Sequence, residues 1–450
     1  MYQHLKNLVF AFLLAFSLAA YAGYVEKFPI TVTQPDGEIV HCFTSGDEFF
    51  NWVHDSNGYT LVRDPQTGVV VYAYLQNDEL VSTGYRVGSV NPASIGLLPW
   101  TIISAEKREQ LRNDFINAAP PKKTRKGNDI LYAGQNDGVI NNIVIYIRFA
   151  DETEFAPKAN IYDDMFNKDS ANFPSMYRYF KETSYGKTLI SSTFYPTSNG
   201  NTILSYQDTA MRSYYLPYNA VTNPNGYDGF SERMTREHQL LKSAVEAVSS
   251  QIPPSLVIDF NNDGEVDNVC FIVRGTPSSS TLLWPHKTYF SPSDNVIING
   301  KYVINYNLQV ETHLDGQGAS VLAHEMFHTL GAPDLYRYIN TSITPVGNWD
   351  LMASNIEPPQ SSTAYMKYKY GGWIDSIPEI TQSGTYTLNN VWHPTNNAYK
   401  IASPNSTTEF FVVEYRNKNI YWDSLIPGNG LIIYRINTMA GWGNMLGPPD

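Results

Sequence analysis

The stretch Val321-Leu-Ala-His324-Glu325-Met-Phe-His328-Thr-Leu-Gly331-Ala-Pro-Asp334 decides how the surrounding domain folds. Its apolar residues predict a buried helix, on which His324 and His328 leave the same face and can reach one metal ion. Glu325 lies one position further round, so its carboxylate stays off the metal but close to a metal-bound water. The pattern predicts a catalytic zinc site; an accidental match, with core histidines bonded to backbone, is the alternative.

The residues after the second histidine are expected to turn the chain back toward the metal. Gly331 can adopt the positive φ that ends a helix, and Pro333 prevents the helix from continuing. Asp334 is then the predicted third zinc ligand, because zinc accepts carboxylate oxygen and a catalytic site has three protein ligands plus water. Asp350 and Glu357 are the fallback carboxylates for this position.

A second motif, Gly347-Asn-Trp-Asp-Leu-Met352-Ala-Ser, follows the first. An HExxHxxGxxD pattern with a Met turn resembles a metzincin-type peptidase. More narrowly, HEMFHTLGAPDLY together with PVGNWDLMAS resembles the immune inhibitor A family of secreted metallopeptidases. The resemblance implies an α+β, metzincin-like catalytic domain in which Met352 packs its thioether under the zinc site. Ordinary core packing is the alternative for Met352.

Composition indicates a folded, exported protein. The chain has a formal net charge of −12, a pI near 5.2 and a 42% apolar fraction. The acidic balance argues against nucleic acid and anionic membrane surfaces as partners. Residues 1–22, with Lys6, an apolar run and Ala20-Tyr-Ala22, are typical of a cleaved secretion signal, and an uncleaved anchor is the alternative. No later segment is apolar enough to span a membrane, so we expect a secreted protein, or a periplasmic or cell-surface one.

Residues 23–118 predict a small β-rich domain. Short alternating runs between about Ile30 and Trp100 are separated by Gly- and Asp-containing turns. The segments TQPDGE and GDEFFNWVHDSNGYTLVRD resemble the N-terminal propeptide domain that precedes this family's catalytic domains. Ser104 is a candidate N-cap for a helix over 104–117. Cys42 and Cys270 fall in different domains, so two separate buried thiols are favoured over a bridge.

Residues 119–134 predict an exposed linker. Two prolines are followed by four basic residues, which will not pack into a core: Lys122, Lys123, Arg125 and Lys126. Exposed linkers are where proteases cut, so we interpret this segment as the site at which a zymogen is opened. A simple interdomain spacer is the alternative.

Residues 135–378 are the predicted catalytic domain. It opens with a strand over 142–151 that reads as buried on both faces, followed by helices over 172–187 and 232–249. NFPSMYRYFKETSYGK and DFNNDGEVDNV resemble family segments that precede the zinc helix. In the metzincin-like reading, a strand over 302–311 is an exposed edge that aligns peptide substrates by backbone pairing.

Two further features within this domain have open interpretations. The oxygens of Asp259, Asn261, Asp263 and Asp267 are spaced as in a calcium loop, but Cys270 stands where an EF-hand needs a bidentate glutamate. The alternatives are a calcium site of another kind and an acidic turn joining strands over 256–260 and 269–273. His286 is either a group near the metal or substrate, or, as we favour, a structural histidine.

Residues 379–450 predict a β-rich extension, with strands over 384–388, 409–416 and 430–435. FFVVEYRN and WDSLIPGNGLIIYRI resemble the family's extension after the catalytic domain. Because the family's members usually continue further, the resemblance implies an incomplete final subdomain. The sequence shows no internal repeat.

Taken together, these features predict a secreted, zinc-dependent endopeptidase made as a zymogen. Zinc would be held by His324, His328 and Asp334, and Glu325 would take a proton from the zinc-bound water and deliver it to the leaving amine. Protein or peptide chains would be its substrates. The alternatives are a non-catalytic secreted binding or adhesion protein with a peptidase fold, and zinc used only for structure.

Overall fold

The computed structural model describes residues 25–118, 136–277, 283–337 and 344–438. The predicted secretion signal and the predicted linker over 119–134 lie outside these ranges. The prediction of a mixed α and β fold is confirmed. None of the helices in the described ranges is long and apolar enough to cross a membrane.

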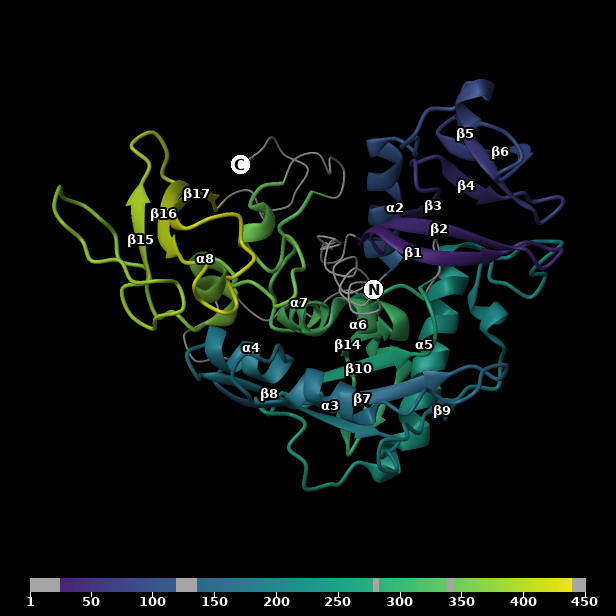
Figure 1. The fold of residues 1–450 in the computed structure, drawn as a ribbon. Helices are drawn as coiled ribbons and strands as arrows, with labels where there is room; N and C mark the ends of the chain where they lie inside the picture. The colour runs from purple at the N-terminus through teal and green to yellow at the C-terminus, as the bar shows by residue number, and fades with distance from the viewer. Residues whose placement is uncertain (1–24, 119–135, 278–282, 338–343, 439–450) are drawn as a thin grey trace, which may run out of the picture.

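The N-terminal domain is a six-stranded antiparallel sheet whose strands pair in sequence order (Figure 1). The strands are β1 (Val25–Thr33), β2 (Ile39–Gly46), β3 (Asn51–His54), β4 (Thr60–Arg63), β5 (Val70–Gln76) and β6 (Glu79–Arg86). Helix α2 (Ala105–Ala118) follows, and the Ser104 hydroxyl accepts a hydrogen bond from the Lys107 N–H at 3.1 Å, as the predicted N-cap. Cys42 and Cys270 are buried, unbridged thiols, so that prediction is confirmed.

The second domain is built on a sheet with the order β11-β14-β10-β7-β8. Four strands are parallel, and β11 is antiparallel to its neighbour β14. These strands are β7 (Gly138–Arg148), β8 (Thr188–Tyr195), β10 (Asn268–Val273), β11 (His286–Tyr289) and β14 (Asn305–Val310). The short strands are β9 (Tyr206–Gln207), which pairs with β7, and β12 (Ile297–Ile298) with β13 (Lys301–Tyr302).

Helices cover both faces of this sheet. Helix α5 (Gly229–Val248) packs on one face, where Leu241, Val245 and Val248 join the core residues of the strands. On the other face lie α3 (Ala159–Asn167), α4 (Met176–Thr183) and α7 (Ala319–Thr329), with α6 (Glu311–Gln317) directly before α7 (Figure 1). The predicted helices over 172–187 and 232–249 are therefore confirmed, each with shifted ends. Strand β7 is buried on both faces, as its continuous apolar run predicted.

One predicted strand is not at the sheet edge where we expected it, and two others are absent. Strand β14 lies between β11 and β10 and is not an edge, because β11 folds back antiparallel on it. Residues 256–260 form no strand, since their backbone closes the acidic turn locally: the Asp267 N–H donates to the Ile258 carbonyl at 2.8 Å. Residues 384–388 are also irregular, and Tyr386 in their middle is 41% exposed, so they lack the burial that would hold a strand.

The C-terminal region adds a three-stranded antiparallel sheet. Its strands are β15 (Ala398–Ala402), β16 (Glu409–Arg416) and β17 (Gly430–Asn437), which confirms the two predicted strands over 409–416 and 430–435. The sheet packs against α8 (Ala364–Met366), where Ala364, Val391 and Val412 form a small apolar core. This region is therefore joined to the second domain through its own packed interface.

A row of asparagines crosses the inside of the central sheet. The Asn307 side-chain N–H donates to Asn268 at 3.4 Å, Asn268 donates to Asn142 at 2.7 Å, and Asn142 donates to Ser192 at 3.0 Å. The Thr329 hydroxyl, at the end of α7, also donates to the Asn268 oxygen at 3.0 Å. The row thus connects four strands and the helix that carries the histidine motif.

Candidate metal centre

The first turn of helix α7 is capped by a residue from a distant part of the chain. Gly318 has a φ of +65°, and a Cβ at that position would lie 2.8 Å from the Glu357 carboxylate. That carboxylate accepts the Ser320 N–H at 2.9 Å, so it caps the first turn of the helix. Burial raises the pKa of Glu357 to about 8. Glu357, a fallback carboxylate for the metal, therefore caps the opposite end of α7. No pattern around it in the sequence indicated this role.

The three predicted ligands come together at the other end of the helix. His324, His328 and Asp334 each offer one ligand atom, and these atoms lie within 4.8 Å of one another. Asp334 Oδ1 is 3.0 Å from His324 Nε2 and 3.3 Å from His328 Nε2. The turn that returns Asp334 uses Gly331, whose φ is +105° and whose N–H donates to the His328 carbonyl at 2.9 Å.

The hydrogen bonds of the two Nδ1 atoms determine which ring nitrogens of His324 and His328 carry a proton. His324 Nδ1 lies 3.2 Å from the Leu351 carbonyl and His328 Nδ1 lies 2.8 Å from the Ala332 carbonyl. Because a carbonyl only accepts, both Nδ1 atoms carry a proton, and each neutral ring then has a lone pair on Nε2. When both rings are neutral, two lone pairs and a carboxylate oxygen converge on one point, an arrangement that a cation, either a proton or a metal ion, would stabilise. Two nitrogens and one oxygen match the donor set of a catalytic zinc site.

The electrostatics of the group indicate that, without a metal, a proton is the cation that it holds. Burial alone would lower the pKa of His328, but the charge of Asp334 raises it to about 9. Burial would raise the pKa of Asp334, but His328 and His324 lower it well below its usual range. Without a metal the group therefore holds a proton at neutral pH. A metal ion would compete with that proton for the same lone pairs.

The Met turn lies directly behind the ligands. Met352 is fully buried, and its carbonyl accepts the N–H of Leu335, the residue after Asp334, at 2.8 Å. The Asp350 carboxylate shapes the turn by accepting the Met352 N–H at 2.8 Å and the Thr363 N–H at 2.6 Å. Asp350 is therefore engaged in the turn and is not brought to the ligand group. With the Leu351 carbonyl on His324, the turn fixes both a histidine and the aspartate.

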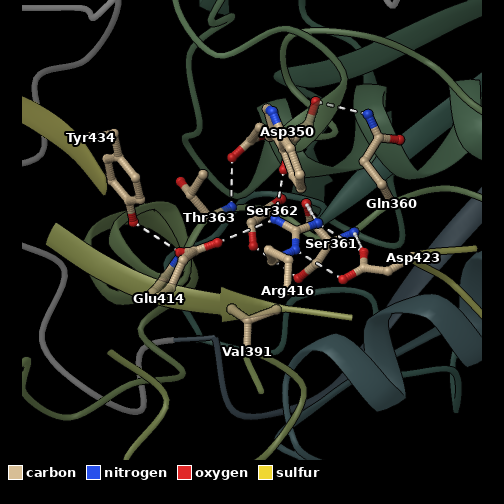
Figure 2. A network of polar contacts seen from close by, with 12 residues as sticks. Asp350, Gln360, Ser361, Ser362, Thr363, Val391, Glu414, Arg416, Asp423 and Tyr434 are labelled. Atoms are coloured by element: carbon tan, nitrogen blue, oxygen red, sulfur yellow. Dashed lines mark hydrogen bonds and ion pairs between the residues drawn. The ribbon is translucent and has the colours of Figure 1, made fainter. Parts of the chain in front are cut away.

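A buried polar network anchors this turn to the C-terminal sheet (Figure 2). Arg416 on β16 is fully buried and pairs with Asp423 at 2.8 Å and with Glu414 at 3.2 Å. Its guanidinium also donates to the Trp349 carbonyl at 2.6 Å and to the Ser361 carbonyl at 3.2 Å. The C-terminal sheet consequently supports the loop that orients the candidate metal ligands.

Glu325 is placed near the ligand group but outside it. Glu325 is 3% exposed, and the charge of its carboxylate contributes to the raised pKa of His328. Its carboxylate oxygens are not among the atoms that converge on the metal position. This placement suits a general base, because a proton acceptor has to lie beside the metal and not on it.

The calcium-like loop is held by contacts within the protein. Lys301 Nζ lies 2.6 Å from Asp259, which also accepts the backbone N–H groups of Asp263 and Gly264. Asp267 accepts the Phe260 N–H at 3.0 Å, and Asn261 donates to Asp263. An ammonium group thus neutralises the charge of Asp259, and the geometry favours the acidic-turn interpretation.

His286 lies on the α5 face of the sheet, in a buried ion pair. Its Nε2 is 2.9 Å from Glu237 and its Nδ1 is 2.6 Å from the Trp284 carbonyl, so both nitrogens donate and the ring is charged. Burial opposes this charge, but Glu237 raises the pKa of His286. This is the structural histidine that we favoured. Its partner Glu237 is buried on α5 together with Arg233 and Arg236, and no sequence motif singled it out.

No family model matches this chain and no curated protein matches it, so the functional argument rests on the geometry of His324, His328, Asp334 and Glu325.

Proposed function

We propose that this chain is a zinc-dependent endopeptidase with a metzincin-like catalytic domain, similar to the immune inhibitor A family. The observation that carries the proposal is the convergence of two imidazole lone pairs and one carboxylate oxygen within 4.8 Å, beside a buried glutamate that is not a ligand. A structural zinc site would be closed by a fourth protein ligand. The three residues that converge here leave one position for water or substrate.

The chemistry assigned to the site divides between the metal and Glu325. When bound by His324, His328 and Asp334, zinc supplies acidity to a water and polarises a carbonyl oxygen. Glu325 accepts the proton of the attacking water and delivers it to the leaving amine as the peptide bond breaks.

A sheet edge beside the zinc helix supports a peptide substrate. Strand β11 has one neighbour, β14, among the described strands, and α7 packs close to β11. An extended peptide can pair with such an edge through backbone hydrogen bonds, which recognise chain direction and not side chains. We therefore place substrate alignment on β11, in the role that the sequence had suggested for residues 302–311.

The proposal includes export and activation by cleavage. The secretion signal and the basic linker that motivate these steps lie outside the described residues. Support comes from the metal centre itself, since His324 and Glu325 are 0% and 3% exposed in the uncut chain. A peptidase has to expose these groups to its substrate, so the uncut chain is the form we expect to be inactive.

The test pairs zinc content with cleavage of unfolded casein, before and after limited trypsin treatment. We expect one zinc per chain in the wild type and in Glu325→Gln. Of these two proteins, only the wild type should cleave casein, and only after trypsin treatment. Glu246→Gln, an exposed site on α5, is the matched control and should cleave like the wild type. A wild type that binds zinc and never cleaves would instead support a non-catalytic binding protein.

A further inference from the structure

A single side chain closes the Met turn from outside it. Gln360 is fully buried, and its amide nitrogen donates to the Asp350 carbonyl at 3.0 Å and to the Ser354 carbonyl at 2.7 Å. These carbonyls stand at the two ends of the segment 350–354, so one amide group holds both ends together. Figure 2 shows the Gln360 amide directed toward Asp350.

The position of Gln360 is itself fixed from two sides. Its carbonyl accepts the hydroxyl of Tyr179, a buried residue of α4, at 3.0 Å. The next residue, Ser361, donates its N–H to the Asp423 carboxylate at 3.1 Å, and its carbonyl accepts from the Arg416 guanidinium at 3.2 Å. The amide of Gln360 therefore acts on the Met turn from a fixed point between α4 and the buried charges of the C-terminal region.

The residues between the two ends of this segment act on two of the three candidate metal ligands. The Leu351 carbonyl accepts a hydrogen bond from Nδ1 of His324 at 3.2 Å, and the Met352 carbonyl accepts the N–H of Leu335, the residue after Asp334, at 2.8 Å. A displacement of the segment would therefore move the acceptor of the histidine and the backbone beside the aspartate together.

His328 does not depend on the Met turn in this way. Its Nδ1 lies 2.8 Å from the Ala332 carbonyl, which belongs to the turn that ends its own helix. The Gly331 N–H closes the same turn on the His328 carbonyl at 2.9 Å. His328 is thus an internal reference: a change in the Met turn should disturb the hydrogen bond of His324 and leave that of His328 in place.

Stability alone does not account for an amide at this position. The side-chain oxygen of Gln360 is buried and has no hydrogen-bond partner among the residues that the structure describes. A buried oxygen without a partner opposes folding, and it offsets much of what the two hydrogen bonds of the same amide contribute. A methionine of similar volume would avoid this cost, but it could not hold the two ends of the turn.

We propose that Gln360 is a positioning residue of the metal centre, whose amide fixes the Met turn so that the Leu351 carbonyl orients His324 and the Met352 carbonyl holds the backbone beside Asp334. The inference rests on the proposed function, because it concerns the same centre. Groups that orient a metal ligand typically change metal affinity or activity by about 10- to 100-fold when they are lost. Gln360 acts one step further out, so we expect an effect at the lower end of this range.

The test uses Co2+ as the probe in the full uncut chain and does not depend on peptidase activity. Co2+ bound at Nε2 shifts the Nδ1 proton of a histidine ligand far outside the ordinary range of a proton NMR spectrum, so His324 and His328 should each give one exchangeable signal. The rate at which each proton exchanges with water reports the hydrogen bond of that Nδ1. The rate at which EDTA removes Co2+ reports how firmly the whole centre holds the metal.

Two substitutions of Gln360 carry the test. We expect Gln360→Met to speed the exchange of one signal, that of His324, and to release Co2+ to EDTA on the order of tenfold faster than the wild type, with the signal of His328 unchanged. Gln360→Asn keeps the amide but shortens its reach, so it should affect the same signal by a smaller factor. It also carries the test if Gln360→Met does not fold.

Asn397→Leu is the matched control. Asn397 is 4% exposed, and its amide nitrogen donates to the Tyr185 hydroxyl at 2.9 Å and to the His393 carbonyl at 2.8 Å. This variant also removes a buried amide with two hydrogen bonds, but neither bond involves the Met turn. It should lower the melting temperature as Gln360→Met does, and leave both NMR signals and the EDTA rate like those of the wild type.

The outcomes separate this inference from the proposed function. If the Gln360 variants leave the exchange and EDTA rates unchanged, or if Asn397→Leu changes them as much, Gln360 is not a positioning residue. The inference also fails if both histidine signals change equally, because the effect then does not pass through the Met turn. In each case the peptidase proposal stands as long as the trypsin-treated wild type cleaves casein. A chain that binds no Co2+ would overturn the metal centre and both proposals with it.

Discussion

Replacing Arg416 with methionine is expected to destabilise the second domain strongly, because the guanidinium is fully buried among charges. The variant leaves Asp423 and Glu414 buried beside one another without their common partner, and it removes the donors to the Trp349 and Ser361 carbonyls. Breaking a buried pair by removing one member costs about 3 to 5 kcal/mol. For a domain of this size, such a loss lowers the melting temperature by at least about 6 °C.

Thermal unfolding followed by tryptophan fluorescence measures this change, since Trp422, next to Asp423 in the sequence, is buried. Arg435→Met is the matched control: its side chain is 38% exposed and lies 4.0 Å from Glu409. We expect the control to change stability by less than about 1 kcal/mol. The reasoning is refuted if the two variants melt within about 2 °C of each other.

Three further predictions concern single groups. The Glu237–His286 pair should stabilise the fold fully between about pH 4.5 and 6.5. Above this window the stabilisation is lost as His286 deprotonates through its raised pKa. Below it the stabilisation is lost as Glu237 becomes protonated toward its pKa of about 2. Urea unfolding across pH should therefore show a weaker dependence in Glu237→Gln, and an unchanged profile would contradict the pairing. Glu357→Gln should fold and bind zinc like the wild type, because a pKa of about 8 keeps the carboxyl mostly neutral at pH 7. Glu357→Ala removes the helix cap and should lower the free energy of unfolding by about 1 kcal/mol. Equal melting temperatures for Glu357→Ala and the wild type would argue against the cap. Asp334→Ala should weaken zinc binding at least about a hundredfold in chelator competition, while Asp263→Asn leaves it unchanged; stoichiometric zinc in Asp334→Ala would require another ligand.

Local sequence patterns predicted much of the fold and the positions of the candidate ligands. The spacing of His324, His328, Gly331 and Asp334 acts within one helix and the turn that follows it, so the residues alone determine that the side chains face each other. The same holds for α5, because the spacing of apolar residues along its sequence already defines its apolar face. The structure brings together the three residues that this reasoning selected.

The remaining features depend on pairings between distant segments. Which strand becomes the sheet edge depends on whether residues 286–289 fold back on β14, and no property of β14 alone decides it. Glu357 caps α7 from a loop beyond the Met turn. Residues 256–260 have a strand-like composition, yet the acidic turn after them takes up their hydrogen bonds.

The asparagine row inside the central sheet has a consequence for how the domain can be assembled. Its amides run donor to acceptor in one direction, from Asn307 through Asn268 and Asn142 to Ser192. If β10 slipped by one residue, Asn268 would turn to the opposite, apolar face and its neighbours would lose their partners. The row therefore selects one register of the strands. In the neighbouring registers, buried amides would lack hydrogen-bond partners, so only one register of the sheet is low in energy.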